Sequence, residues 1–176
     1  MPERHDFILS PIADPDSYTL LVHTDQHLTG RPTGDIEQFR SMFVPDFNAT
    51  VADSREHGRH VYSISLGDAG WEKHWVEYSF GLPDVAGEFD RLDCPVFSVI
   101  GNHDYNPYVS GDVNSTALFR ENFGPTYYSF NLGRVHYVVL DDIIYINGNA
   151  TPTEMGDRTY RRRIDADQLR WRKADL

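Results

Sequence analysis

Three apolar runs, each ending in a polar cluster, constrain the fold more than any other feature of the sequence. The runs cover residues 18–22, 61–66 and 94–100, and their length and composition are typical of buried strands. In parallel α/β sheets the carboxyl ends of the strands meet at one edge, and ligands bind along that edge. The sequence therefore predicts an α/β fold in which three polar clusters share one edge of a sheet.

The polar clusters contain the side chains that metal ions prefer. They read Asp25-Gln26-His27, Gly67-Asp68 and Gly101-Asn102-His103-Asp104. Carboxylate and amide oxygens together with imidazole nitrogens suit hard and borderline cations. Each pattern alone is common in turns, but three of them in this order, each after a buried strand, indicate a metal site.

The order and spacing of these clusters resemble the signature of the calcineurin-like metallophosphoesterase superfamily. That signature runs Asp-x-His, Gly-Asp and Gly-Asn-His-Asp or Glu, and it continues with two histidine blocks, Gly-His and Gly-His-x-His. The likeness covers nearly the whole chain from Tyr18 and includes residues 123–130 and 135–142. The two late blocks are absent, because no histidine follows His136. The resemblance implies an α/β fold, an incomplete four-layer αββα sandwich with the metals at the sheet edges.

The expected domain organisation follows from the same resemblance. Residues 18–176 are expected to form a metallophosphoesterase catalytic domain truncated at its C-terminal side, with the remainder of the domain beyond Leu176. Residues 1–17 are polar and contain three prolines. They are expected to form an irregular arm or the tail of a preceding module, whose last strand would be residues 7–9.

The resemblance also implies a dinuclear centre of two divalent metal ions. Asp25 and His27 would bind the first metal, Asn102 would bind the second, and Asp68 would bridge both. Two metals can clamp the oxygens of a phosphoryl group and activate a water molecule as the nucleophile. Mn, Fe, Zn, Co and Mg all fit such a mixed set of oxygen and nitrogen ligands, so the identity of the metals stays open.

Two further residues would act on the substrate rather than on the metals. His103 matches the family position that faces the phosphate, where it stabilises transition-state charge or protonates the leaving oxygen. A neighbouring carboxylate raises imidazole basicity and fixes its tautomer, and Asp104 matches that orienting partner. Trp71 stands where the purple acid phosphatase branch has an iron-binding tyrosine. Because indole offers no acceptor to a metal, that branch is disfavoured.

These assignments favour a metal-dependent phosphoesterase that acts on a small phosphomonoester or phosphodiester. A second interpretation is a catalytically inactive metal-binding or scaffold module of the same fold, which the missing histidine blocks favour. A third is a sugar- or lipid-recognition domain with structural calcium, which is disfavoured because imidazole is a poor calcium ligand. The second metal would keep only Asn102 and the bridging Asp68, so the 176-residue chain alone is not expected to be a competent hydrolase.

Charge and hydropathy narrow the expected partners. The formal net charge is −11, and residues 161–163 form the only dense arginine run, so long nucleic acids are not expected as partners. No stretch approaches the ~18 apolar residues that span a bilayer, so no membrane association is expected. The first residues do not resemble a signal peptide. A signal that had been removed would leave no trace, so the compartment stays open.

The rest of the sequence predicts further helices and a hairpin, and it gives the other histidines no role as metal ligands. The single Cys94 lies in an apolar run and is expected to be a small buried hydrophobe. Four histidines are expected on a solvated surface, namely His5, His57, His60 and His74. His23 and His136 are expected to be packed or hydrogen-bonded within strands. The remaining elements are mostly helices. A helix over residues 36–56 should be interrupted by Pro45, and further helices are predicted over 83–92 and 116–122. A hairpin should pair 127–131 with 134–140, and Asp165 should cap a final helix.

Overall fold

The three predicted strands form a parallel sheet in a mixed α/β fold. The computed structural model describes residues 14–176, so His5 and the expected strand at residues 7–9 lie outside the described residues. The sheet has the order β1 (Tyr18–His23), β2 (His60–Ser65) and β3 (Val96–Ser98). All three strands run in the same direction, so their carboxyl ends meet at one edge as predicted.

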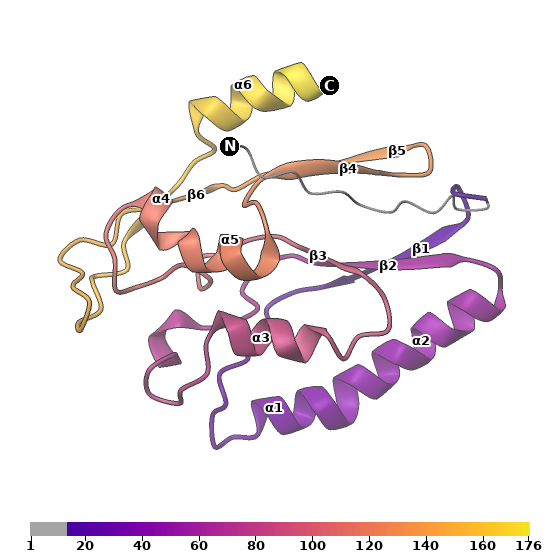
Figure 1. The fold of residues 1–176 in the computed structure, drawn as a ribbon, viewed down its shortest axis with the longest axis horizontal. Coiled ribbons are helices and arrows are strands. Elements are labelled where there is room, and N and C mark those ends of the chain that lie inside the picture. Colours follow the sequence, from indigo (N-terminus) through magenta and orange to yellow (C-terminus); the bar gives the residue numbers. More distant parts are fainter. Residues whose placement is uncertain (1–13) are drawn as a thin grey trace, which may run out of the picture.

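Helices cover one face of this sheet (Figure 1). The predicted helix 36–56 is present as α1 (Asp35–Gln38), the π-helical segment η1 (Phe39–Phe43) and α2 (Val44–Glu56). The interruption ends at Phe43, two residues before Pro45, which has no N–H to donate to the preceding turn. Helix α3 (Leu82–Phe89) begins with Pro83 in its first turn, as predicted.

The apolar side chains of these helices form the main core against the sheet. Phe39, Phe47 and Val51 recur on one side of the long helix and are buried together with Val85 and Phe89. His23 belongs to the same region, because its ring lies 5.4 to 5.9 Å from three phenylalanine rings. The prediction that His23 is packed within its strand is therefore confirmed.

The predicted hairpin lies on the opposite face of the parallel sheet. Its strands are β4 (Tyr128–Leu132) and β5 (Val135–Val139), joined at Gly133, which adopts a positive φ of 54°. The ring of Phe130 stacks on Phe97 of β3 with 3.8 Å between centroids. Figure 1 shows the hairpin between the parallel sheet and the last helix, α6 (Ala166–Asp175). The layers therefore run α6, hairpin, parallel sheet, and α1 to α3.

Several shorter elements complete the described chain. The predicted helix 116–122 is present as α5 (Ala117–Phe123), and two single turns, η2 (Glu72–His74) and α4 (Asp112–Ser115), lie in loops near the sheet edge. A third sheet was not predicted, and it pairs β6 (Ile143–Tyr145) with β7 (Tyr160–Arg162) in antiparallel register. No helix among residues 14–176 combines the length and hydrophobicity that a membrane crossing requires.

The backbone of the buried Asp141 joins α6 to the rest of the fold. The backbone N–H of Asp141 donates to Gln168 Oε1 at 2.9 Å, and Gln168 Nε2 donates to the Asp141 carbonyl at 2.9 Å. The Asp141 carboxylate accepts hydrogen bonds from the Tyr105 hydroxyl at 2.8 Å and the Ile143 N–H at 3.0 Å. Asp165 caps α6 by accepting from the Gln168 N–H at 2.8 Å, as predicted.

Asp141 should make the free energy of unfolding depend on pH. Burial raises its pKa from 3.8 to about 6, so between these values the folded state binds more protons than the unfolded state. Its contribution to stability is therefore fully present below pH 4 and is lost as the pH rises through 6. The loss is at most about 3 kcal/mol. Asp141→Asn should remove this dependence, which urea unfolding of both proteins between pH 4 and 7 would measure. Equal slopes in the two proteins would contradict the assignment.

Candidate metal centre

Backbone hydrogen bonds join the loop after β1 to the loop after β2. The N–H of Asp25 donates to the Gly67 carbonyl at 3.1 Å, and the N–H of His27 donates to the Asp68 carbonyl at 3.1 Å. The next residue, Leu28, continues this pairing with Ala69 at 2.9 Å. These bonds hold the first two predicted clusters side by side at the sheet edge.

Two glycines let the loop after β3 approach just as closely. A Cβ on Gly67 would lie 2.8 Å from Gly101 Cα, and a Cβ on Gly101 would lie 2.2 Å from the backbone nitrogen of Asp68. Real Cβ atoms do not come so near to backbone, so both positions require glycine. The N–H of His103 then donates to Asp68 Oδ1 at 2.9 Å. The third cluster is thereby fixed against the second.

Asp25, His27 and Asp68 form a group that can hold a cation. One candidate ligand atom from each lies within 4.8 Å of the others. His27 Nδ1 is buried and has no hydrogen-bond partner among residues 14–176, which leaves an unsatisfied donor or acceptor in this group. Two carboxylates and an imidazole are a ligand set that suits a divalent transition metal. The residues present therefore fit a metal.

The backbone at these three residues is strained. Asp25, His27 and Asp68 have φ angles of 56°, 47° and 52°, in the left-handed region that non-glycine residues rarely occupy. Such conformations cost about 1–3 kcal/mol each, and they concentrate at functional sites where the surrounding structure enforces them. Five further non-glycine residues among residues 14–176 share a positive φ, so the strain includes the proposed ligands without being confined to them.

The other predicted ligand, Asn102, lies in the turn between Gly101 and His103. Gly101 packs against Gly67, and the His103 N–H reaches Asp68, so Asn102 belongs to the same edge of the sheet. Asn102 is partly buried. The structure thus brings all four predicted metal ligands to neighbouring loops at one edge.

Glu72 is the carboxylate that contacts His103. Its side chain is 2% exposed, and His103 Nδ1–H donates to Glu72 Oε2 at 2.8 Å. Arg158 Nη1 donates to the other oxygen of Glu72 at 2.9 Å. Desolvation by itself would lower the pKa of His103. The hydrogen bond and charge of Glu72, together with the charges of Asp68 and Asp104, outweigh it and raise that pKa above its usual value.

The structure corrects the assignment of Asp104 as the partner of His103. Asp104 is fully buried, and its carboxylate accepts the N–H groups of Gly70 at 3.0 Å and Gly101 at 2.9 Å. Burial raises the pKa of Asp104 to about 7. Asp104 therefore ties the second and third loops together, while Glu72 orients the imidazole.

Trp71 lies among the histidines of the site. Its ring centroid is 5.1 Å from that of His27, 5.4 Å from that of His103 and 5.1 Å from that of His74. Arg31 lies over the same indole, with its guanidinium carbon 5.4 Å from the centroid. The predicted solvated surface for His74 is wrong, because its side chain is only 15% exposed and packs on Trp71.

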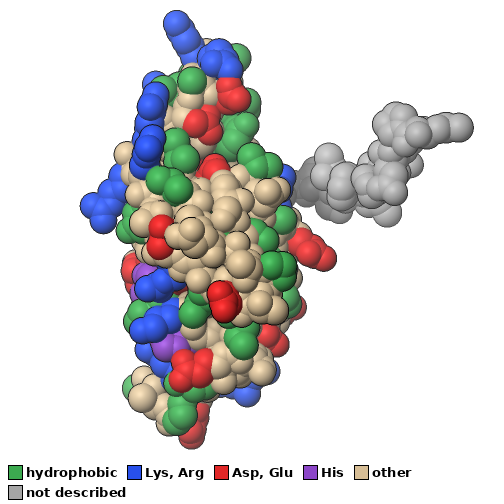
Figure 2. All heavy atoms as spheres, turned by 90° about the vertical axis from the view of Figure 1, so that its left-hand side faces the viewer, with side chains coloured by type: hydrophobic (Ala, Val, Ile, Leu, Met, Phe, Trp, Pro, Cys, Tyr) green, Lys and Arg blue, Asp and Glu red, His purple; other side chains and the backbone are tan. Residues whose placement is uncertain are grey.

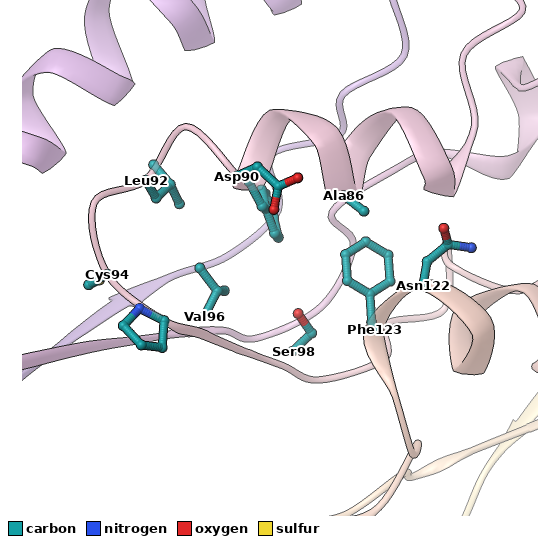
Figure 3. Close-up of a pocket in the computed structure, with 10 residues that line it drawn as sticks. Ala86, Asp90, Leu92, Cys94, Val96, Ser98, Asn122 and Phe123 are labelled. Atoms are coloured by element: carbon teal, nitrogen blue, oxygen red, sulfur yellow. The ribbon is translucent and has the colours of Figure 1, made fainter. Parts of the chain in front are cut away.

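A separate cavity of about 310 Å³ lies beneath β3 between α3 and α5 (Figure 3). Its lining includes Ala86, Leu92, Val96 and Phe123, and none of the predicted site residues. Cys94 also lines it, is 8% exposed, and has its thiol pKa raised by burial. Cys94 is therefore a buried hydrophobe, as predicted, and this cavity lies apart from the metal-binding group.

No protein-family model and no curated protein matches this chain. The function must therefore be inferred from the residues and the geometry of the site.

Proposed function

We propose that this chain carries the metal- and phosphate-binding residues of a metal-dependent phosphoesterase of the calcineurin-like type. The substrate is a phosphomonoester or a phosphodiester. The observation that carries this proposal is the convergence of Asp25, His27 and Asp68 within 4.8 Å, with His103 bonded to Asp68 through its backbone N–H. A cation group beside an oriented imidazole is the combination that phosphoester hydrolysis requires.

The first metal would be held by Asp25, His27 and Asp68. Asp68 offers a second oxygen, so it can share a second divalent metal with Asn102. A divalent metal in this position supplies a Lewis acid for the phosphoryl group. The Trp71 ring packs beside His27, and Arg31 lies over the same indole.

His103 would supply the proton that the leaving oxygen needs. Because Glu72 holds Nδ1, Nε2 is the nitrogen left to face the substrate. The Glu72 carboxylate raises the pKa of the imidazole and so favours the protonated form, in which Nε2–H is available for donation. Arg158 holds Glu72 in turn, and it thereby fixes the orientation of the imidazole.

The layered arrangement supports the same superfamily. The order of helix, hairpin, parallel sheet and helices corresponds to an αββα sandwich in which the second sheet is incomplete. A catalytically inactive metal-binding module of this fold is the second candidate. It is favoured by the ligand count, because residues 14–176 contain one group of three acidic or histidine ligands, whereas the second metal would rely on Asp68 and Asn102.

The test titrates the protein with Mn²⁺ and then measures the binding of orthophosphate and the hydrolysis of an aryl phosphate and a bis-aryl phosphate. We expect one tightly bound metal and phosphate binding that depends on it. His103→Ala should retain the metal and lower any turnover by about 10²- to 10⁴-fold, since it removes only the proton donor.

Three other results would change the interpretation. Loss of metal from His103→Ala in step with activity would make His103 a ligand rather than a proton donor. Metal-dependent hydrolysis of either ester would exclude the inactive module. Absence of Mn²⁺ binding at any tested concentration would overturn the proposal.

A further inference from the structure

The positive charge of the chain is concentrated in one short segment. Residues 158–173 contain seven of the 16 Lys and Arg residues but only two of the 27 Asp and Glu residues, in a chain with a net charge of −11. The seven residues, which we name the basic strip, are Arg158, Arg161, Arg162, Arg163, Arg170, Arg172 and Lys173. They lie on the loop before β7, on and directly after β7, and on α6.

Most of the basic strip is exposed and lacks a neutralising partner. Arg158 pairs with Glu72 and Arg170 pairs with Asp167. The other five make no ion pair with any carboxylate among residues 14–176, and all five are exposed. Three consecutive unpaired arginines repel one another, and a bound anion relieves that repulsion.

The basic strip begins at the proposed active site. Arg158 touches Glu72, which touches His103, and β7 starts two residues later. At about 3.3 Å per residue, Arg161 and Arg163 lie at most roughly 10 to 17 Å along the chain from Arg158. Figure 2 shows Lys and Arg side chains gathered along one margin of this face, from the end where α6 lies down to the histidine side chains.

We propose that the basic strip binds the additional phosphate groups of a multiply phosphorylated, chain-like substrate whose terminal phosphate occupies the metal site. This inference rests on the proposed phosphoesterase function and names its substrate class. Six of the seven residues are arginines, whose planar guanidinium groups match the oxygens of phosphate in paired hydrogen bonds. A linear polyphosphate has this chemistry.

Other anionic partners fit the surface less well. Single-stranded nucleic acids bind through aromatic side chains on which the bases stack, but Trp171 is partly buried and packs on Tyr127 with 5.3 Å between centroids. An anionic membrane requires a broad apolar face beside the charges, and the large apolar side chains exposed on or next to α6 are Leu169 and Leu176.

The test compares two double variants that remove the same charge. Arg161→Ala/Arg163→Ala removes two side chains that lie on one side of the chain if the alternation of β7 continues one residue past its end at Arg162. Arg59→Ala/Arg134→Ala removes two exposed arginines from the α2–β2 and β4–β5 turns and serves as the control. Calorimetry would measure binding of a short linear polyphosphate and of orthophosphate at several salt concentrations, with and without Mn²⁺.

We expect the wild-type protein to bind polyphosphate at least about tenfold more tightly than orthophosphate. The Arg161/Arg163 variant should bind polyphosphate about five- to tenfold more weakly. The slope of log affinity against log salt concentration should become shallower by the equivalent of about one to two phosphate contacts. The control variant should stay within about twofold of wild type. Orthophosphate binding in the presence of Mn²⁺ should be the same in all three proteins.

Equal affinities in the two variants would overturn the proposal. It would also be overturned if single-stranded DNA or anionic vesicles bound more tightly than polyphosphate at the same salt concentration. If only the phosphoesterase proposal is wrong, the result differs. Orthophosphate would then show no Mn²⁺-dependent binding, while Arg161 and Arg163 would still strengthen polyphosphate binding without metal.

Discussion

Replacement of Asp68 by asparagine should lower the affinity for the first metal at least about 100-fold. Loss of an outer partner of a metal ligand already costs about 10- to 100-fold in metal affinity, and in the proposed site Asp68 would supply a charged ligand directly. Asparagine is the informative replacement, because it tolerates the left-handed φ of 52° and still accepts the His103 N–H. Asp68→Ala should lose the metal and destabilise the turn as well. Elemental analysis after dialysis against Mn²⁺ would measure the bound metal.

Asn102→Ala provides the matched comparison for Asp68. Asn102 lies in the adjoining turn, but it is proposed to bind only the second metal. Its removal should therefore leave the first metal in place and lose less total metal than Asp68→Ala. Equal and full occupancy in both variants would exclude Asp68 as the shared ligand. Circular dichroism of each variant would establish that the fold persists.

The sequence predicted that Asp25, His27 and Asp68 would lie close together, because the physical basis of that proximity is local. Each cluster follows its own strand, and parallel strands of one sheet bring their carboxyl ends together whatever else surrounds them. The glycines at 67 and 101 belong to the same pattern, because the close contact of the two turns excludes any side chain there. Strand, turn and ligand are thus encoded within a few residues of one another.

The partner of His103 could not be predicted in the same way. Glu72 lies in a single helical turn without periodicity, and the arginine that holds it is 86 residues away in the sequence. Asp104 was the natural assignment because it follows His103 directly, but the tight turn directs its carboxylate back to Gly70 and Gly101. Sequence proximity therefore indicated the wrong carboxylate.

The third sheet was missed for a different reason. Strands β6 and β7 have three residues each, and a long loop separates them. The arginines of β7 conceal any apolar alternation, which is the signal from which short strands are recognised. Asn147, fully buried, stabilises the loop by donating to the carbonyls of Pro107 and Val109 at 2.7 and 2.8 Å. Such tertiary contacts produce no periodic pattern in the sequence.

Gly101→Ala should disrupt the site without removing any ligand. The added Cβ would lie 2.2 Å from both the backbone nitrogen and the Oδ1 atom of Asp68. Backbone cannot yield as a flexible side chain does, so the turn that carries Asn102 and His103 must move away from Asp68. We expect a loss of about 1–3 kcal/mol in the free energy of unfolding, as for overpacked cores. Metal affinity should fall along with it, measured by Mn²⁺ titration of the folded variant.

Gly87→Ala is the control that separates this steric effect from a general intolerance of alanine. Gly87 lies within α3, and a Cβ there meets nothing within 4 Å. Because alanine is favoured over glycine in a helix, this variant should be more stable by about 0.5–1 kcal/mol and should bind the metal as the wild type does. If Gly101→Ala retained both stability and Mn²⁺ affinity, the close approach of the two turns could not be what positions the ligands. The metal-binding group would then have to be held by the strands alone.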